Sequence, residues 1–393
     1  MMETYSMFIA VRCLVVSISV TYSIWLPDMK NVFDNDPLLM HVLTSTLLHI
    51  CLPFAIICFI TTELTGNIGQ VDKVWSIIPT LTCWYTTFLH WQWNGFNEVN
   101  VKYVVMSSLV TVWAVKMLRG LYARGGVHFP CFWRGTDDYR WEAVRNQLPS
   151  LIKTNRFLFA CFNFGFLCVS QIFLLWAMSG MVFIAVLAKD RLKNSKGKSD
   201  VLECLPGVLF IAWFVCETIA DRQQQTYQEH KLKWNIKTKS NTSLYNDLLD
   251  TESSKLKNCT MRCEATDSDD FHYKLGFYMK GLFAYSRHPN FLAEQSIWIS
   301  FYLFSVDFHQ VGRNGIQGMF QVGGIMNSSI CGCLLVVLLF KISTDLTEEI
   351  SSSKYKGYKL YQQHVPRLFN AVDLLRRLFL GEVPNQDWKK DLE

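Results

Sequence analysis

The sequence predicts an all-α fold, a polytopic membrane helical bundle of about seven or eight transmembrane spans. Half of the 393 residues are hydrophobic, and phenylalanine and tryptophan are abundant among them. These residues are gathered in blocks that are too long for ordinary core helices, with polar or charged stretches between the blocks. Since a helix needs about 20 apolar residues to cross a bilayer, the blocks favour a membrane protein over a soluble one.

The charge and the cysteine content exclude several other classes. A net charge of +5 is modest for a chain of 393 residues. We therefore expect contact with lipid headgroups or an anionic cofactor, and no nucleic-acid binding. The 13 cysteines are scattered, and no pair has the C-x-x-C spacing. This pattern favours reduced, buried thiols over a disulfide framework or a metal site.

The N-terminal part of the chain contains four apolar blocks. No small-residue cleavage site follows the first block, so we interpret it as a retained helix and not as a signal peptide. Pro53 lies within the second block and is expected to kink that helix. The four blocks cover residues 7–26, 38–62, 74–93 and 100–118.

The later spans are less regular. Residues 157–188 form one long apolar run, which we interpret as a helix with a re-entrant turn or an extra short helix near Ser179 and Gly180. A solvated charge run follows at 189–200. Further spans are predicted at residues 201–220, 289–306 and 325–342.

Residues 232–274 differ in composition from the rest of the chain. They are rich in serine, threonine, asparagine, aspartate and lysine, and they contain few large apolar side chains. Such a segment cannot bury enough surface to fold alone, so we predict a disordered, non-catalytic insertion. The glycine-rich stretch at 312–324 has no strand before it and does not indicate a dinucleotide-binding loop.

The stretch from Gly281 to Trp298 carries the strongest chemical signal. Arg287 and His288 stand directly before Pro289, at the predicted start of an apolar helix. Two cations beside a helix N-terminus favour a bound anion such as a phosphate. Glu294 lies inside the apolar run, where an unpaired carboxylate is expensive, so we expect it to have a partner or a function. The alternative interpretation is a basic loop that flanks the membrane.

Other acidic residues allow two interpretations each. Asp72 can be a helix cap paired with Lys73, or a functional carboxylate at the mouth of the third block. Glu217 and Asp221 are four residues apart and share one helix face. They can be solvated at a helix end, or they can face a polar cofactor cavity.

The stretch DDYRWEAVR at 137–145 alternates charged and aromatic residues. This alternation predicts a helix in the membrane interface whose charges pair locally. Tyr139 and Trp141 are expected to anchor it at the level of the lipid headgroups.

Five stretches of the chain together resemble the steroid 5-alpha-reductase superfamily. The central one, YSRHPNFLAE at 285–294, is similar to the signature of that superfamily, although Phe283 and Ala293 stand where tryptophan and glycine are common. More distantly, the chain resembles the isoprenylcysteine methyltransferases. The other matching stretches are VDKVWSIIP at 71–79, DDYRWEAVR at 137–145, ETIADRQ at 217–223 and YKGYKLYQQHVPRLFN at 355–370.

This resemblance implies an NADPH-dependent membrane oxidoreductase that reduces a conjugated carbon–carbon double bond in a lipid or sterol-like substrate. It implies Asp72 and Glu294 as catalytic residues, with Asp72 handling the substrate carbonyl. The cofactor-binding residues that it implies are Glu217, Asp221, Arg222, Tyr285, Ser286, Arg287, His288, Asn290, Tyr358 and Tyr361.

The resemblance also implies an organisation of the chain. We expect N-terminal transmembrane helices at 1–65, a catalytic membrane domain at 66–370 and a tail at 371–393. The distribution of lysine and arginine places the cofactor side in the cytoplasm, and the endoplasmic reticulum is the expected membrane. Two alternatives stay open. One is an S-adenosylmethionine-dependent methyltransferase acting on a lipid or prenyl substrate, and the other is a non-catalytic membrane protein with this fold.

Overall fold

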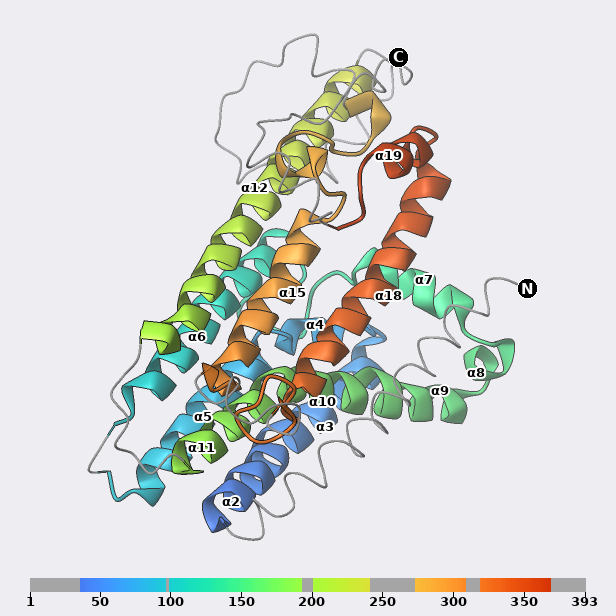
Figure 1. Cartoon of the computed structure of the whole chain (residues 1–393). Coiled ribbons are helices and arrows are strands. Elements are labelled where there is room, and N and C mark those ends of the chain that lie inside the picture. Colours follow the sequence, from blue (N-terminus) through green and yellow to red (C-terminus); the bar gives the residue numbers. More distant parts are fainter. Residues whose placement is uncertain (1–35, 97–98, 193–200, 241–272, 309–318, 369–393) are drawn as a thin grey trace. The chain divides into compact units, whose positions relative to one another are not determined.

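The computed structural model describes residues 36–96, 99–192, 201–240, 273–308 and 319–368. Within these ranges every regular element is a helix, as the sequence predicts (Figure 1). The chain divides into two compact units. The first unit comprises residues 1–214 and 295–343, and the second comprises residues 215–294 and 344–393.

The described part of the first unit begins with a nearly continuous helix made of α2 (Pro37–Thr46), η1 (Leu47–Cys51) and α3 (Leu52–Thr65). The carboxylate of Asp36 caps it by accepting a hydrogen bond from the amide of Leu38 at 3.1 Å. Pro53 is the second residue of α3, directly after the π-helical turn η1. A wider turn at this point accommodates the proline, whose ring cannot take part in the regular hydrogen-bond ladder.

The short helix α4 (Gln70–Val74) leads into a helical hairpin of α5 (Ile77–Trp93) and α6 (Val101–Ala123). The side chain of Asn100 caps α6 through the amide of Lys102. Buried hydroxyl groups of Thr87 and Ser107 join the two helices at 3.0 Å. The hairpin is therefore held by polar contacts as well as by its apolar faces.

The predicted re-entrant turn near Ser179 and Gly180 is wrong. Residues 156–192 form one helical rod, in which the π-helical segment η3 (Ala177–Met181) takes the place of a turn. A π turn is wider than an α-helical turn, and it occurs within a helix without breaking it. In chain order the rod consists of α9 (Arg156–Phe162), η2 (Asn163–Val169), α10 (Ser170–Trp176), η3 and α11 (Val182–Leu192).

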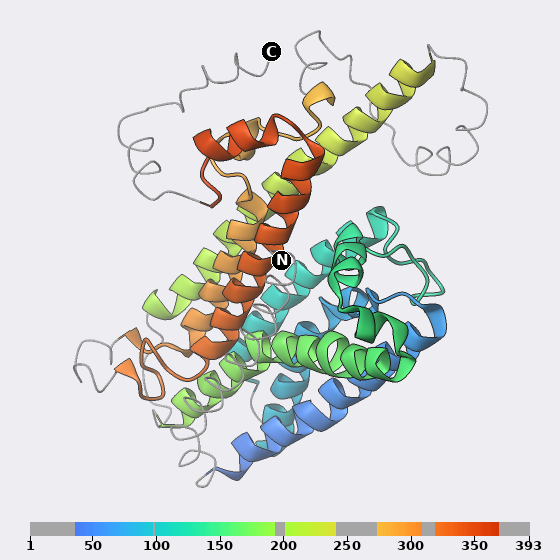
Figure 2. The same ribbon diagram turned by 90° about the vertical axis from the view of Figure 1, so that its right-hand side faces the viewer.

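This rod is the core of the first unit. Nearly every side chain of α10, η3 and α11 is buried, which is the pattern of a helix surrounded by others. Helices α2 and α3 pack along it (Figure 2). The Trp176 indole donates a buried hydrogen bond to the Thr46 hydroxyl at 3.0 Å.

The remaining helices follow in order. Two short helices precede the rod, α7 (Tyr139–Gln147) and α8 (Ser150–Thr154). Helix α12 (Leu205–Ser240) extends 20 residues beyond the predicted span, so the first residues of the predicted insertion at 232–274 are helical. Residues 241–272 lie outside the described part of the chain. The rest are η4 (Val201–Cys204), η5 (Gly281–Ala284), α15 (Pro289–Tyr302), η6 (Leu303–Ser305), α18 (Ile330–Lys354) and α19 (Tyr358–His364).

Five described helices are long and apolar enough to cross a membrane, which indicates an integral membrane protein. The predicted number of seven or eight spans stays a prediction. The first predicted span, at 7–26, lies outside the described residues, and α5 has only 17 residues. The five helices cover Pro37–Thr65, Val101–Ala123, Arg156–Leu192, Leu202–Ile236 and Ile330–Lys354.

Gly332 allows α18 to approach the rod closely. A Cβ atom at this position would lie 2.2 Å from the carbonyl oxygen of Ala177 and 2.6 Å from its carbonyl carbon. Because these are backbone atoms, they cannot turn aside as a flexible side chain can.

We expect Gly332→Ala to lower the free energy of unfolding by about 1–3 kcal/mol, since one extra methyl group would separate two packed backbones. Gly120→Ala in α6 is the matched control, because a Cβ there would meet no atom within 4 Å. The control should be neutral or stabilise by about 1 kcal/mol. Thermal unfolding in detergent measures both, and equal midpoints for the two variants would contradict the close contact.

Candidate functional site

The signature segment, residues 281–294, consists of the turn η5 and the first turns of α15 in the second unit. Pro289 is the first residue of α15, where its missing N–H leaves no hydrogen bond unmade. The Ser286 hydroxyl accepts a hydrogen bond from the amide of His288 at 3.2 Å and donates one to the carbonyl of Arg367 at 3.1 Å. Ser286 thus holds the turn before α15 and attaches the C-terminal tail (residues 355–368) to it.

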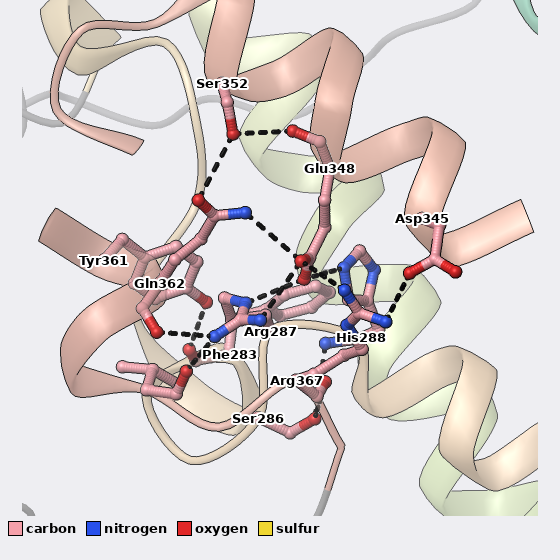
Figure 3. A network of polar contacts seen from close by, with 11 residues as sticks. Phe283, Ser286, Arg287, His288, Asp345, Glu348, Ser352, Tyr361, Gln362 and Arg367 are labelled. Carbon is pink, nitrogen blue, oxygen red and sulfur yellow. Dashed lines mark hydrogen bonds and ion pairs between the residues drawn. The ribbon is translucent and has the colours of Figure 1, made fainter. Parts of the chain in front are cut away.

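Arg287 is the centre of a buried polar network (Figure 3). Its Nε and Nη2 atoms donate to the two carboxylate oxygens of Glu348, at 2.8 and 3.1 Å. Its Nη1 atom donates to the carbonyl oxygens of Gln362, at 2.8 Å, and of Val365. The side chains of Arg287 and Glu348 are only 8% and 5% exposed, so this two-pronged ion pair is shielded from solvent.

The Glu348 carboxylate makes hydrogen-bond contacts with three further side chains. Nε2 of His288 lies 3.0 Å from one carboxylate oxygen, and the other accepts from Gln362 and Arg367 at 3.2 Å each. With Arg287 the carboxylate has four side-chain donors, of which three belong to the signature segment or to α19, and Arg367 follows α19 in the tail. A carboxylate with this many donors keeps its charge in a buried position, because the donors replace lost water.

The network fixes the tail against the signature segment. The amides of Arg287 and His288 donate to the carbonyls of Pro366 and Arg367, at 3.0 and 3.2 Å. The Tyr361 hydroxyl donates to the carbonyl of Phe283 at 2.6 Å. Tyr361 and Tyr358 are buried in a small apolar cluster with Phe277, Met279 and Val365.

Four polar residues of the second unit, here called the polar set, lie on α12 and α15. Glu217 and Asp221 are one turn apart on α12, and Asn290 and Glu294 are one turn apart on α15. The Asn290 side-chain amide lies 3.4 Å from a carboxylate oxygen of Asp221 and donates to it. Glu217 and Glu294 are each only 3% exposed. Carboxylates and a side-chain amide are the kinds of group that accept from and donate to a polar ligand.

A pocket of about 350 Å³ also lies in the second unit. Two stretches of chain form it, residues 222–230 of α12 and residues 273–280 before the signature segment. Among the described residues that line it, none is acidic. They are Arg222, Gln223, Thr226, Tyr227, His230, Tyr273, Tyr278 and Lys280.

Asp72 belongs to the first unit and contacts a residue that the sequence places elsewhere. The Trp141 indole N–H donates to the Asp72 carboxylate at 2.5 Å. Trp141 therefore bonds within the protein, and its role as a headgroup anchor stays a prediction. Burial raises the pKa of the Asp72 carboxyl to about 6, and the hydrogen bond from Trp141 offsets part of that rise.

Further contacts attach the stretch 133–145 to the loop before α4. The Asp137 carboxylate accepts from the amide of Gly69 at 3.1 Å, and the Lys73 ammonium group donates to the carbonyl of Trp133 at 2.6 Å. The Arg145 guanidinium donates to the carbonyl of Gly66 at 3.0 Å. The predicted pairing of charges within 137–145 is present between Asp138 and Arg140. The stretch thus packs against Asp72 and its surroundings.

A family of proteins of unknown function, DUF1295, matches residues 58–365 of the chain. The chain belongs to the DUF1295 family. The match includes all twelve residues that the sequence predicts for the site, from Asp72 to Tyr361. An uncharacterised protein of Schizosaccharomyces pombe is 31% identical over 314 residues, which cover 79% of this chain and 74% of the yeast protein. No solved structure matches the chain.

Most of the residues predicted for the site of this DUF1295 protein lie in one of its two units. Eleven of the twelve residues belong to the second unit, and Asp72 belongs to the first. Tyr285 is half-buried in the signature segment, and Arg222 lines the pocket. Tyr358 and Tyr361 were expected near a cofactor, but neither lines the pocket, because their rings form the interior of the tail.

Sequence reasoning missed the residues that line the pocket beside Arg222. A signal for some of them was present, because Gln223, Thr226, Tyr227 and His230 recur at helical spacing on α12. The contribution of Tyr273, Tyr278 and Lys280 had no such signal, since these residues come from a different part of the chain.

We expect Arg287→Gln to lower the free energy of unfolding by about 3–5 kcal/mol, because it leaves the Glu348 carboxylate buried without its main partner. Arg367→Gln is the matched control, since the Arg367 side chain is 39% exposed and should cost less than about 1 kcal/mol. Chemical denaturation followed by tryptophan fluorescence compares them. Equal losses would show that the network does not depend on Arg287.

We expect Asp72 to make stability depend on pH. Its pKa of about 6 lies above the usual range of aspartate, so the folded protein binds a proton more tightly than the unfolded chain. Stability should therefore fall as pH rises from about 4 to about 6, and level off above that. Asp72→Asn should lack this decline. Trp141→Phe should extend the decline to higher pH, because loss of the Trp141 hydrogen bond raises the pKa of Asp72 further.

Trp133→Phe is the control for Trp141→Phe, because only the backbone carbonyl of Trp133 takes part in these contacts and its side chain is exposed. Thermal unfolding midpoints measured across the pH range decide the matter. A wild-type profile that coincides with that of Asp72→Asn would refute the raised pKa.

Proposed function

We propose that this protein is a membrane oxidoreductase that uses NADPH to reduce a conjugated carbon–carbon double bond in a lipid or sterol-like substrate. The observation that carries the proposal is the polar set on α12 and α15, with the Asp221–Asn290 hydrogen bond between the helices. The resemblance to the steroid 5-alpha-reductase superfamily supports it, because Asn290 and Glu294 match residues on the nicotinamide side of the cofactor.

The chemistry of these side chains fits the carboxamide of a nicotinamide ring. A carboxamide has an N–H₂ group that donates and a carbonyl that accepts, so a carboxylate and a side-chain amide can hold both ends of it. Glu294 and Glu217 supply buried acceptors, and Asn290 supplies the donor. Residues fixed on helices orient such a ring better than residues on loops. NADPH, when bound, supplies the hydride.

The Arg287 network has a supporting role in this proposal. Arg287 makes four hydrogen bonds within the network, so a phosphate would have to displace Glu348 to reach its guanidinium. Arg287 and His288 hold the start of α15, and they thereby hold Asn290 and Glu294 in register with α12. The proposal assigns the cofactor phosphates to cations elsewhere in the second unit, of which Arg222 was predicted from the sequence.

Asp72 is the proposed acid that polarises the substrate carbonyl. A carboxyl group whose pKa is raised to about 6 is partly protonated near neutral pH, so it can donate a hydrogen bond to a carbonyl oxygen. The five apolar spans give a lipid substrate access through the bilayer. The proposal includes the endoplasmic reticulum membrane and a cofactor side that faces the cytoplasm, where NADPH is available.

An S-adenosylmethionine-dependent methyltransferase is the second candidate. The Arg-His-Pro entrance and a pair of glutamates near the C-terminus, Glu348 and Glu349 of α18, are features shared with isoprenylcysteine methyltransferases. Glu348 contacts Arg287 and His288 of that entrance. S-adenosylmethionine carries a positive sulfonium and no phosphate. The cations of the pocket therefore favour NADPH over it.

A thermal-shift panel of NADPH, NADH and S-adenosylmethionine on the full chain in detergent tests the proposal. NADPH at 100 times its Kd should stabilise the protein by about 2.7 kcal/mol, because a ligand that binds only the folded state shifts the equilibrium. Glu294→Gln should reduce this shift. Glu229→Gln, a change at a half-buried acid on α12 outside the polar set, should leave it unchanged. Stabilisation by S-adenosylmethionine alone would favour the methyltransferase.

A further inference from the structure

The end of α6 and the loop that follows it expose large aromatic side chains. Tyr122, Phe129 and Trp133 are 52%, 64% and 51% exposed. The ring centroids of Tyr122 and Phe129 are 6.1 Å apart, and the ring of Phe132 lies 6.1 Å from that of Phe129. We call residues 119–134 the aromatic loop. A group of exposed apolar rings of this kind marks a surface that contacts another protein or a membrane.

The backbone of the aromatic loop is held in place from the inside. The side chains of Gln70 and Lys73 both donate to the carbonyl oxygen of Trp133, at 3.1 and 2.6 Å. The two ends of the loop also meet closely, since a Cβ atom at Gly135 would lie only 2.5 Å from the carbonyl carbon of Gly126. Because these contacts fix the backbone, the exposure of the rings is a property of the folded loop.

Two candidate membrane spans of the first unit end beside the aromatic loop. One of them ends at Thr65 of α3, and the other ends at Ala123 of α6. The side-chain amide of Asn67, two residues after α3, donates to the carbonyl of Gly135 at 3.2 Å, so the two span ends are joined through the loop. The end of a span marks the edge of the hydrocarbon layer. The loop therefore lies at the level of the lipid headgroups.

The charges of the aromatic loop suit anionic headgroups. Arg119 and Arg134 are both exposed. Arg124 is exposed as well, although the nearby Asp138 carboxylate attracts it. The carboxylates of Asp137 and Asp138, which follow the loop, bond to other groups of the protein. Arginines at a membrane surface are attracted to anionic lipids and bind phosphate groups, and tyrosine and tryptophan are enriched at the same depth.

We propose that the aromatic loop binds the headgroups of anionic phospholipids through Arg119 and Arg134. The rings of Tyr122, Phe129 and Trp133 lie beside these headgroups, at the edge of the hydrocarbon layer. Insertion is shallow, because an irregular backbone cannot enter the hydrocarbon layer without losing hydrogen bonds to water. This surface goes beyond the proposed function and is independent of it, since it includes none of the residues proposed for catalysis or cofactor binding.

Native mass spectrometry of the full chain in detergent, with phosphatidylserine or phosphatidylcholine added, tests the charge preference. The wild type should bind phosphatidylserine more tightly. Arg119→Gln and Arg134→Gln should each weaken that binding by about fivefold and leave phosphatidylcholine binding unchanged. Lys359→Gln is the charge-matched control, because Lys359 is exposed on α19 in the second unit. Equal wild-type affinity for the two lipids would overturn the proposal, and so would wild-type phosphatidylserine binding in both arginine variants.

Fluorescence quenching in nanodiscs of phosphatidylcholine and phosphatidylserine tests the depth of the loop. The chain has 13 tryptophans, so the emission of Trp133 is obtained as the difference between the wild type and Trp133→Phe. Lipids brominated near the headgroup end of their acyl chains should quench this difference emission. Quenching by aqueous acrylamide and not by the brominated lipids would show that the rings face water or await a protein partner, and would overturn the proposal. Thermal unfolding verifies that each variant is folded.

Discussion

The buried ion pair between Arg287 and Glu348 is the interaction on which the second unit depends. Removing two charges from water costs free energy, and this cost is offset only when the N–H groups of one and the oxygen lone pairs of the other all have hydrogen-bond partners. Here Glu348 has four side-chain donors, and Arg287 also reaches two backbone carbonyls of the tail. Since these partners come from three separate parts of the chain, the pair can form only when the signature segment, α18 and the tail are assembled correctly. It therefore specifies the fold of this unit as much as it stabilises it.

The first unit uses a different principle. Its core is a predominantly apolar helical rod that is buried over most of its length, and a glycine in α18 permits close backbone packing against it. One group of polar interactions lies where the stretch 133–145 contacts the loop before α4 and α4 itself. That arrangement keeps a carboxyl group, Asp72, in an environment that favours its protonated form. An apolar helical framework and these polar contacts are suited to holding one acid in a defined position.

The sequence alone predicted the helices better than it predicted their partners. Apolar length is a local property, so the spans at 38–62 and 100–118 could be identified from composition, whereas the extension of α12 to Ser240 could not, because its last turns are polar. Arg287 and His288 could be identified as important, but their partner Glu348 lies about 60 residues away and only the fold brings it near. The same holds for Trp141 and Asp72, which are 69 residues apart. The turn predicted near Ser179 and Gly180 was wrong because serine and glycine also occur in π-helical turns, which leave the helix intact.

The length of α12 has a consequence for how two unlike molecules can reach one protein. At about 1.5 Å per residue its 36 residues extend about 54 Å, nearly twice the thickness of the hydrocarbon layer of a bilayer. About 20 residues suffice to cross that layer, so the last turns of α12, with His230 and Lys231, continue into water. Under the proposed function, a charged cofactor bound at those turns would stay in the aqueous phase, while an apolar substrate would stay dissolved in the lipid. A single continuous helix thus extends from the lipid into water, and under the proposed function each ligand would approach from the phase in which it is soluble.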